Sequence, residues 1–316
     1  MSRFKKVLLV LALGTGFTLF CPTEFFGDST KMKTKASNTI AYEGVRLSLV
    51  MSETEYTQSQ HPFFVFTLQN ISEKPKKGFV RTDPTKYGFK HPAYTPLLPI
   101  RIKLSGKEVS TRPSKTPAYT YKTVIEPGEK YTEITPFLEV VRNSTKLLPQ
   151  GNYEVSTPDR IFTKFKVVEK PDRSVISTKG MAEAKLRELL QDPKTSPGAR
   201  LRLLHDVYTS KRKQVFWKLI TDCDDAFAVI LMLEHLDGEW LDVEGLKKLC
   251  QSKDLAVRGA AMRAFSRLGK NEGAATWLAA FLATQKDELI LREGKDALSV
   301  LKGTKKPNPV KLPPLL

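Results

Sequence analysis

The sequence has few of the residues that most often carry catalysis or bind metals. It contains three cysteines and four histidines among 316 residues, and no two cysteines form a C-x-x-C pair. H-E-x-x-H, G-x-S-x-G and G-x-x-x-x-G-K-[ST] are also absent, which removes the usual signatures of zinc hydrolases, serine hydrolases and nucleotide-binding proteins. We therefore expect a non-enzymatic protein, without catalytic, cofactor-binding or metal-binding residues.

Apolar runs long enough to cross a membrane are lacking as well. One run of 14 residues extends from Val7 to Phe20 and follows Arg3, Lys5 and Lys6. A spanning helix needs about 20 apolar residues, whereas a basic start and a shorter run are typical of an export signal. We expect residues 1–21 to be a signal peptide or signal anchor, and the protein to be periplasmic or extracellular.

The end of this segment leaves three alternatives open. No A-x-A triplet closes the apolar run, and Phe20 stands where a lipoprotein signal has a small residue before its cysteine, here Cys21. Cleavage, lipidation at Cys21 and retention as an anchor are all compatible with the sequence. Only the last two would attach the chain to a membrane.

Charge is strongly of one sign. Basic residues outnumber acidic ones by 51 to 34, and the formal net charge is +17. The excess is spread over both halves of the chain, whereas nucleic-acid-binding proteins gather it in a patch or stripe. Nucleic acid is therefore not an expected partner. A positive field would still attract an anionic envelope surface or an acidic protein.

Residues 39–170 show the two-residue periodicity of half-buried strands. Apolar residues alternate with polar ones at 44–51 and 100–104, and Phe64, Phe66 and Leu68 share one face of a third run. Further strands are predicted at 119–125, 130–135, 151–156 and 161–168. About seven short strands without helical periodicity between them predict an all-β sandwich.

Turn sequences add a resemblance to this prediction. The segment L-P-Q-G-N-Y resembles the corner of immunoglobulin-like sandwiches, in which a tyrosine hydroxyl, here that of Tyr153, bonds back to the backbone. An ordinary turn before a half-exposed tyrosine is the alternative. Together with F-T-L-Q-N-I-S-E-K-P and I-E-P-G-E-K-Y, the segment resembles bacterial immunoglobulin-like modules, which implies a fold but no activity.

Residues 171–179 lose periodicity and contain Pro171, so we expect a linker between two independently folding domains. Residues 180–303 then predict four helical hairpins, because similar second helices recur at intervals of about 30 residues. These second helices begin near Pro197, Asp225, Asp254 and Asp287. The predicted helices are 181–191, 197–208, 212–220, 225–236, 243–250, 255–268, 272–284 and 288–301.

The third of these hairpins resembles the short bacterial form of the HEAT repeat, through Asp254, Val257-Arg258, Ala260-Ala261 and Leu268-Gly269. In the fourth hairpin Asp287 aligns with Asp254, and Arg292 nearly aligns with Arg258. In that family the aspartate caps the second helix and the arginine bonds across repeats. The resemblance therefore implies an all-α solenoid, in which Asp254, Arg258, Asp287 and Arg292 are structural. For Arg258 we expect a bond to an acidic group or carbonyl near a neighbouring helix start.

Val229 and Ile230 stand where the second repeat would place its arginine, so the ladder of arginines is in doubt there. Just before them, the acidic cluster of residues 222–225 could bind a divalent cation. A Thr221-x-x-Asp224 capping box at a helix start is the favoured interpretation.

Two pairs of residues in the repeats each have two possible interpretations. Cys223 and Cys250 are expected as buried thiols, and a disulfide between them is the alternative that export would permit. His205 and His235 fall late in successive second helices, where stacking could bring them together with Asp206 and Glu234 as a metal site. Solvated histidines at helix ends are the more ordinary interpretation.

Aromatic and basic residues indicate a partner-binding surface. Trp240 lies in a tight loop and is expected to be exposed, whereas Trp217 and Trp277 are expected in the core. Lys211, Arg212 and Lys213 precede Trp217 and could join Trp240 in contacting a partner, since tryptophan and arginine are frequent in interface hot spots.

The tail, residues 304–316, is rich in proline and expected to be extended; its leucines either remain free or cover the end of the repeats. Together these features favour an exported, non-enzymatic binding or scaffold protein of the bacterial envelope. A protein partner would be held on the helical repeats. The alternative is an envelope enzyme or enzyme subunit, with its site in or beside the β domain.

Overall fold

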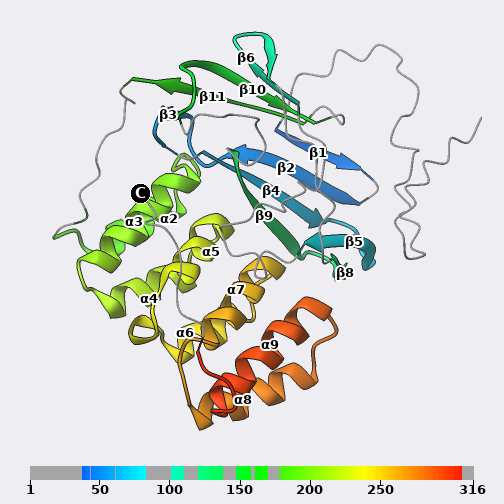
Figure 1. Ribbon diagram of the computed structural model, residues 1–316, viewed down its shortest axis with the longest axis vertical. Coiled ribbons are helices and arrows are strands. Elements are labelled where there is room, and N and C mark those ends of the chain that lie inside the picture. Colours follow the sequence, from blue (N-terminus) through cyan, green and yellow to red (C-terminus); the bar gives the residue numbers. More distant parts are fainter. Residues whose placement is uncertain are drawn as a thin grey trace, which may run out of the picture. The chain divides into compact units, whose positions relative to one another are not determined.

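The computed structural model describes residues 38–42, 44–60, 62–82, 101–109, 120–137, 147–157, 161–169, 178 and 180–307. In this part of the chain, strands in sheets form the N-terminal half and eight α-helices form the C-terminal half (Figure 1). The described residues all belong to one compact unit. The predicted signal segment, nearly all of the linker, and the tail beyond Pro307 lie outside the described residues.

Two sheets make up most of the N-terminal half. The first has the order β1-β2-β4-β9 and is antiparallel throughout: β1 Thr39–Tyr42, β2 Val45–Met51, β4 Phe63–Asn70 and β9 Lys130–Pro136. The second has the order β3-β11-β10-β6-β7: β3 Glu55–Thr57, β11 Phe162–Val168, β10 Gly151–Ser156, β6 Arg101–Leu104 and β7 Lys107–Val109. A third pairs β5 Lys76–Thr82 with β8 Thr120–Ile125.

The two larger sheets share one apolar core. Alternate residues of β2 and β4 meet residues of β6, β10 and β11 there, among them Leu49, Phe64, Phe66, Ile102, Val155 and Phe165. The seven strands predicted from the sequence are present, and β1, β3, β5 and β7 were not predicted. The bond expected at the corner is confirmed, because the hydroxyl of Tyr153 donates to the carbonyl of Pro149 at 3.0 Å. The immunoglobulin-like resemblance itself stays a prediction.

The helices occur in four consecutive pairs. Their bounds are α2 Glu183–Gln191, α3 Pro197–Thr209, α4 Lys213–Thr221, α5 Ala226–His235, α6 Val243–Leu249, α7 Leu255–Phe265, α8 Glu272–Ala283 and α9 Glu288–Leu301. Every one of them was predicted, and each end lies within about three residues of its predicted position. The membership of these pairs in the HEAT-like repeats stays a prediction.

Polar side chains cap the second helix of each pair. Ser196, Asp225, Asp254 and Asp287 each accept hydrogen bonds from backbone N–H groups in the first turn of α3, α5, α7 and α9. One detail of the prediction was wrong. The cap of α5 is Asp225, not Asp224, and Thr221 takes no part, since its hydroxyl donates to the carbonyl of Trp217 at 2.8 Å.

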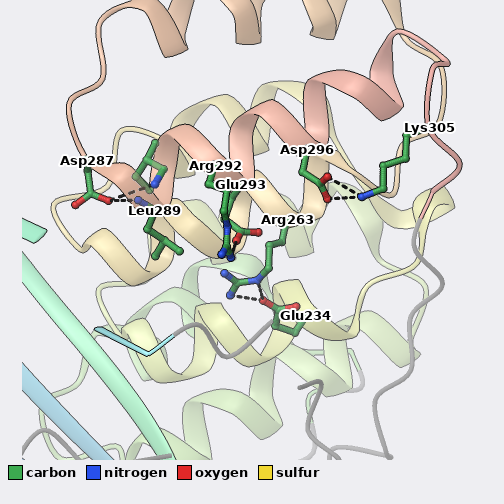
Figure 2. Close-up of polar contacts among 9 residues, drawn as sticks. Glu234, Arg263, Asp287, Leu289, Arg292, Glu293, Asp296 and Lys305 are labelled. Atoms are coloured by element: carbon green, nitrogen blue, oxygen red, sulfur yellow. Dashed lines mark hydrogen bonds and ion pairs between the residues drawn. The ribbon is translucent and has the colours of Figure 1, made fainter. Parts of the chain in front are cut away.

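Ion pairs join neighbouring helices through Arg200 and Arg263, two arginines that the sequence did not single out. Arg200 of α3 bonds to Asp225, the cap of α5, at 2.8 Å. Figure 2 shows Arg263 of α7 bonding back to Glu234 of α5, with Nε and Oε1 2.6 Å apart. Arg292 pairs with Glu293 of its own helix at 2.7 Å.

The second helices also pack against the first sheet. Residues of β2, β4 and β9 that point away from the sheet core, namely Val50, Phe63, Val65 and Ile134, lie against the apolar core of the helices. The ring of Phe63 meets that of Phe227 in α5, with centroids 5.7 Å apart. The first sheet is therefore apolar on both faces and lies between the second sheet and the helices.

Polar contacts flank this apolar interface at two places. At α7, Thr132 of β9 donates its hydroxyl to Asp254 at 2.6 Å, and Arg258 bonds to Glu129, just before β9, at 2.7 Å. At α3, Glu53 accepts hydrogen bonds from Ser196, at 2.6 Å, and from Arg202. The expectation for Arg258 was right about an acidic partner but wrong about its place, because Glu129 lies in the sheet half.

These contacts bear on the predicted domain division. The sheets and helices share an apolar core and buried hydrogen bonds, although the boundary near residue 178 separates them in sequence. Independent folding of the two halves was expected from the sequence and is not tested by these contacts alone. They favour one cooperative unit, and we now expect that result.

Candidate functional site

Five aromatic and imidazole rings gather at the carboxyl ends of the second helices. This ring cluster consists of His205 and Tyr208 of α3, Phe216 of α4, His235 of α5, and Trp240 of the short 3-10 helix η3, Gly238–Trp240. Ring centroids of Tyr208 and Trp240 are 4.5 Å apart, and those of His205 and His235 are 6.1 Å apart. Phe216 is buried beneath, and the other four rings are half-buried.

The local sequence fixes the loop that carries Trp240. Asp237 caps η3 by accepting from the backbone N–H of Trp240 at 3.1 Å, and the indole of Trp217 donates to the carbonyl of Trp240 at 2.7 Å. A side chain at Gly238 would come within 2.6 Å of the carbonyl oxygen of Arg267. Only glycine therefore allows this loop to lie so close to the chain that follows α7.

The basic residues predicted beside Trp240 do border the cluster. Lys211 is exposed, with a φ of 58°, in the turn between α3 and α4. Arg212 donates to the carbonyl of Met181 at 3.0 Å, and Lys213 donates to the carbonyl of Glu239. Arg212 and Lys213 thus also hold the turn in place. Trp240 was expected to be exposed and is instead half-buried, because Tyr208 and Phe216 pack against it.

The two histidines are in an environment that disfavours their charged forms. Burial lowers the pKa of His205, and the nearby carboxylate of Asp206 opposes this. Burial, His205 and Arg267 together lower the pKa of His235, against the opposing effect of Asp237. Both imidazoles are therefore neutral at neutral pH, and they are neither the solvated residues that we expected nor a charged pair.

Two nitrogen atoms next to the cluster are buried without a hydrogen-bond partner, Nδ1 of His235 and Nε of Arg267. The rest of the Arg267 guanidinium donates to the carbonyls of Leu233 and Glu234 at the end of α5. Across the described residues, no three His, Cys, Asp or Glu side chains gather as metal ligands. The His205–His235 pair thus lacks a third ligand there.

The other residues that the sequence analysis singled out in the helices are the two cysteines and two further tryptophans. Cys223 and Cys250 are both unpaired, as the default expectation had them, and burial raises the pKa of Cys223 to about 12 and that of Cys250 further. Trp217 is buried, as predicted, whereas Trp277 is only half-buried.

Chemically, the cluster combines flat apolar rings with neutral imidazoles and a neighbouring lysine. Burial raises the pKa of the Tyr208 hydroxyl, helped by the charge of Asp237, so this group is a neutral donor or acceptor. Such a surface can bury an apolar side chain of a partner and hydrogen-bond to its polar groups. Of the residues in and beside this cluster, the sequence analysis had considered the two histidines and Trp240 as candidates. It had not singled out Tyr208 or Arg267.

Comparisons with known proteins give little further information. No protein-family profile matches the chain, and no curated protein matches it. Among solved structures, the crystal structure of a candidate lipoprotein from Bacillus subtilis aligns over 85% of this chain and 86% of its own, at 8% identity and a TM-score of 0.22. A TM-score this low carries no argument about fold or function. Among the described helices, none combines the length and the apolar character needed to span a membrane.

Proposed function

We propose that the protein is an exported, non-enzymatic binding or scaffold protein of the bacterial envelope, and that it holds a protein partner at the ring cluster. The basic and apolar N-terminal segment supports export. The single observation that carries the binding site is the gathering of His205, Tyr208, His235 and Trp240 as half-buried rings at one place.

The position of the sheet strengthens this choice of surface. Stacked helical pairs commonly bind partners along the layer of their second helices. Here the amino-terminal ends of α3, α5 and α7 already contact the first sheet, through Ser52, Phe63 and Thr132. The ring cluster lies at the opposite ends of α3 and α5. A partner that uses this layer would therefore meet the carboxyl ends of the helices.

The composition of the cluster indicates which residues matter most. Aromatic side chains supply large contact areas at low entropic cost, and alanine substitution of a hot-spot tryptophan typically costs 2 kcal/mol or more. We expect Trp240→Ala to weaken partner binding about 30-fold, which corresponds to about 2 kcal/mol. Tyr208→Ala should weaken it to a similar degree, whereas Phe162→Ala, a half-buried ring on β11, should not.

Site-specific photo-crosslinking in whole cells tests the proposal. A photoreactive amino acid at the exposed position of Lys211 should capture one protein, and the captured band should disappear in the Trp240→Ala background. The same probe at Lys164, exposed on β11, is the matched control. Absence of a band from position 211, an equal band from position 164, or a band that survives Trp240→Ala would each contradict the proposal.

A further inference from the structure

His235 lies where three elements meet at the ring cluster. It is the last residue of α5, and its ring centroid lies 6.1 Å from that of His205 and 6.2 Å from that of Tyr208, both of α3. From α7, the guanidinium of Arg267 donates to the carbonyl of Glu234, the residue before His235, at 2.8 Å. Two rings and a permanent positive charge therefore lie beside this imidazole.

The closed cluster accommodates only the neutral form of His235. Its Nδ1 atom is buried and has no hydrogen-bond partner. A proton on Nδ1 would be a buried donor without an acceptor, so the proton of the neutral ring belongs on Nε2. The charged ring carries a proton on both nitrogen atoms, so its formation would leave a charged N–H group buried and unsatisfied.

The end of α5 does not compensate for this cost. The carboxyl end of a helix normally favours a positive charge, but here Arg267 already donates to the carbonyls of Leu233 and Glu234. The carboxylate of Glu234 is bonded in turn to Arg263 of α7, with Nε and Oε1 2.6 Å apart. Both the free carbonyls and the nearest carboxylate of α5 are thus engaged by arginines.

Carboxylates on the neighbouring elements favour the charged form only in part. Asp237 raises the pKa of His235, but its carboxylate also accepts the backbone N–H of Trp240 at 3.1 Å. Asp206 raises the pKa of His205, and a charged His205 would repel a second charge on His235. Burial outweighs these carboxylates, and the pKa of His235 is lowered.

Movement of His235 would also move Trp240. The chain continues from His235 through Leu236 and Asp237 directly into η3, which carries Trp240. The ring centroid of Trp240 lies 4.5 Å from that of Tyr208. An imidazole that leaves the cluster to reach water would therefore displace the loop that holds the indole and separate it from Tyr208.

We propose that charging of His235 at acidic pH opens the ring cluster and releases the partner bound there. The release rests on the proposed function, whereas the opening is a property of the protein alone. In the open form His235 regains the ordinary histidine pKa of 6.5. The closed form therefore has its full stability above this pH. As the pH falls from there to the lowered pKa, the ratio of open to closed protein rises by about tenfold per pH unit.

Acrylamide quenching of the Trp277→Phe protein measures the opening. Trp217 is only 6% exposed, so the quenched fluorescence comes mainly from Trp240. We expect the quenching constant to rise about twofold between about pH 8 and about pH 5, the range in which histidines titrate. Far-ultraviolet circular dichroism should stay constant over this range. Unchanged quenching would overturn the proposal, and so would a parallel loss of the helical signal, which would indicate general unfolding.

Two histidine variants assign the effect to His235. Phenylalanine retains a flat ring but cannot gain a proton, so His235→Phe should abolish the rise in quenching. His205→Phe is the matched control, because it removes a histidine from the same cluster and leaves His235 to titrate. Since His205 lowers the pKa of His235, the opening should then occur at a higher pH. A rise that persists in His235→Phe, or one that is lost in His205→Phe, would contradict the proposal.

Photo-crosslinking from position 211, performed in envelope extract at the same two pH values, tests the release. The band should be about fivefold weaker at the lower pH, and in His235→Phe the ratio of the two bands should return to about one. Bands of equal strength in the parent protein would overturn the release. Absence of a band at the higher pH would contradict the proposed function and the release with it, whereas the opening is decided by quenching alone.

Discussion

Asp254→Ala is expected to lower the free energy of unfolding by about 2–4 kcal/mol. The carboxylate caps α7 through the N–H groups of Ala256 and Val257, and loss of a cap costs about 1 kcal/mol. It also accepts the hydroxyl and N–H of Thr132 from β9, which would be left buried without this partner, at a further cost of about 1–3 kcal/mol. Burial raises the pKa of the Asp254 carboxyl, so relief of its desolvation offsets part of the loss.

Asp287→Ala is the matched control for this prediction. Asp287 caps α9 through two N–H groups, those of Leu289 and Ile290, whereas Asp254 also bonds to Thr132 of β9. Substitution of Asp287 should cost only about 1 kcal/mol in urea unfolding. In a double-mutant cycle, Asp254→Ala and Thr132→Val should couple by about 1 kcal/mol or more. Equal costs for the two aspartates, with no coupling to Thr132, would show that the contact with the sheet contributes nothing.

Phe227→Ala is expected to have a larger effect still, about 3–5 kcal/mol. Phe227 is 1% exposed, and truncation of a fully buried phenylalanine loses its transfer free energy and leaves a cavity. The ring meets Phe63 of β4 edge to face at 5.7 Å, so the cavity opens between the helices and the first sheet. The loss should therefore weaken both halves of the molecule together.

Two spectroscopic measurements distinguish a loss of stability in both halves from a loss in the helices alone. Urea unfolding followed by tryptophan fluorescence reports the helices, which hold all three tryptophans, and the near-ultraviolet signal of the tyrosines includes the sheets. Both transitions should shift to lower urea by the same amount in Phe227→Ala. A shift of the fluorescence transition alone would mean that α5 and β4 are not coupled.

The sequence predicted secondary structure better than it predicted how the elements pack. The period of about 30 residues located every helix, because caps and apolar stripes are local features. The run that forms β4 was interpreted as half-buried, from Phe64, Phe66 and Leu68 on one face. Its other apolar residues, Phe63 and Val65, were the signal that this strand is buried on both faces, as central strands covered by helices are.

The partners of charged residues were also hard to predict, because they depend on how elements that are distant in sequence pack together. Arg258 resembled a repeat-bridging arginine, but its neighbour on the sheet side, Glu129, is distant in sequence. Arg200, in the first helical pair, makes the bond to a neighbouring helix start that was expected of Arg258. At the ring cluster, the meeting of His205 and His235 was only an alternative to solvated histidines at helix ends, although helix positions had suggested it, and their ring centroids do lie 6.1 Å apart. Trp240 was expected to be exposed because nothing in the local sequence showed Tyr208 packing on it.

The central claim is that the sheets and the helices form one cooperative structure, in which the first sheet covers the second helices. Expression of residues 180–307 alone tests it most directly, with thermal unfolding compared between this fragment and the whole chain. The account predicts a fragment that is helical but melts at a much lower temperature and without a sharp transition, because Phe227, Leu255 and Asp254 lose their partners from the sheet. A fragment with a cooperative transition at the melting temperature of the whole chain would contradict it.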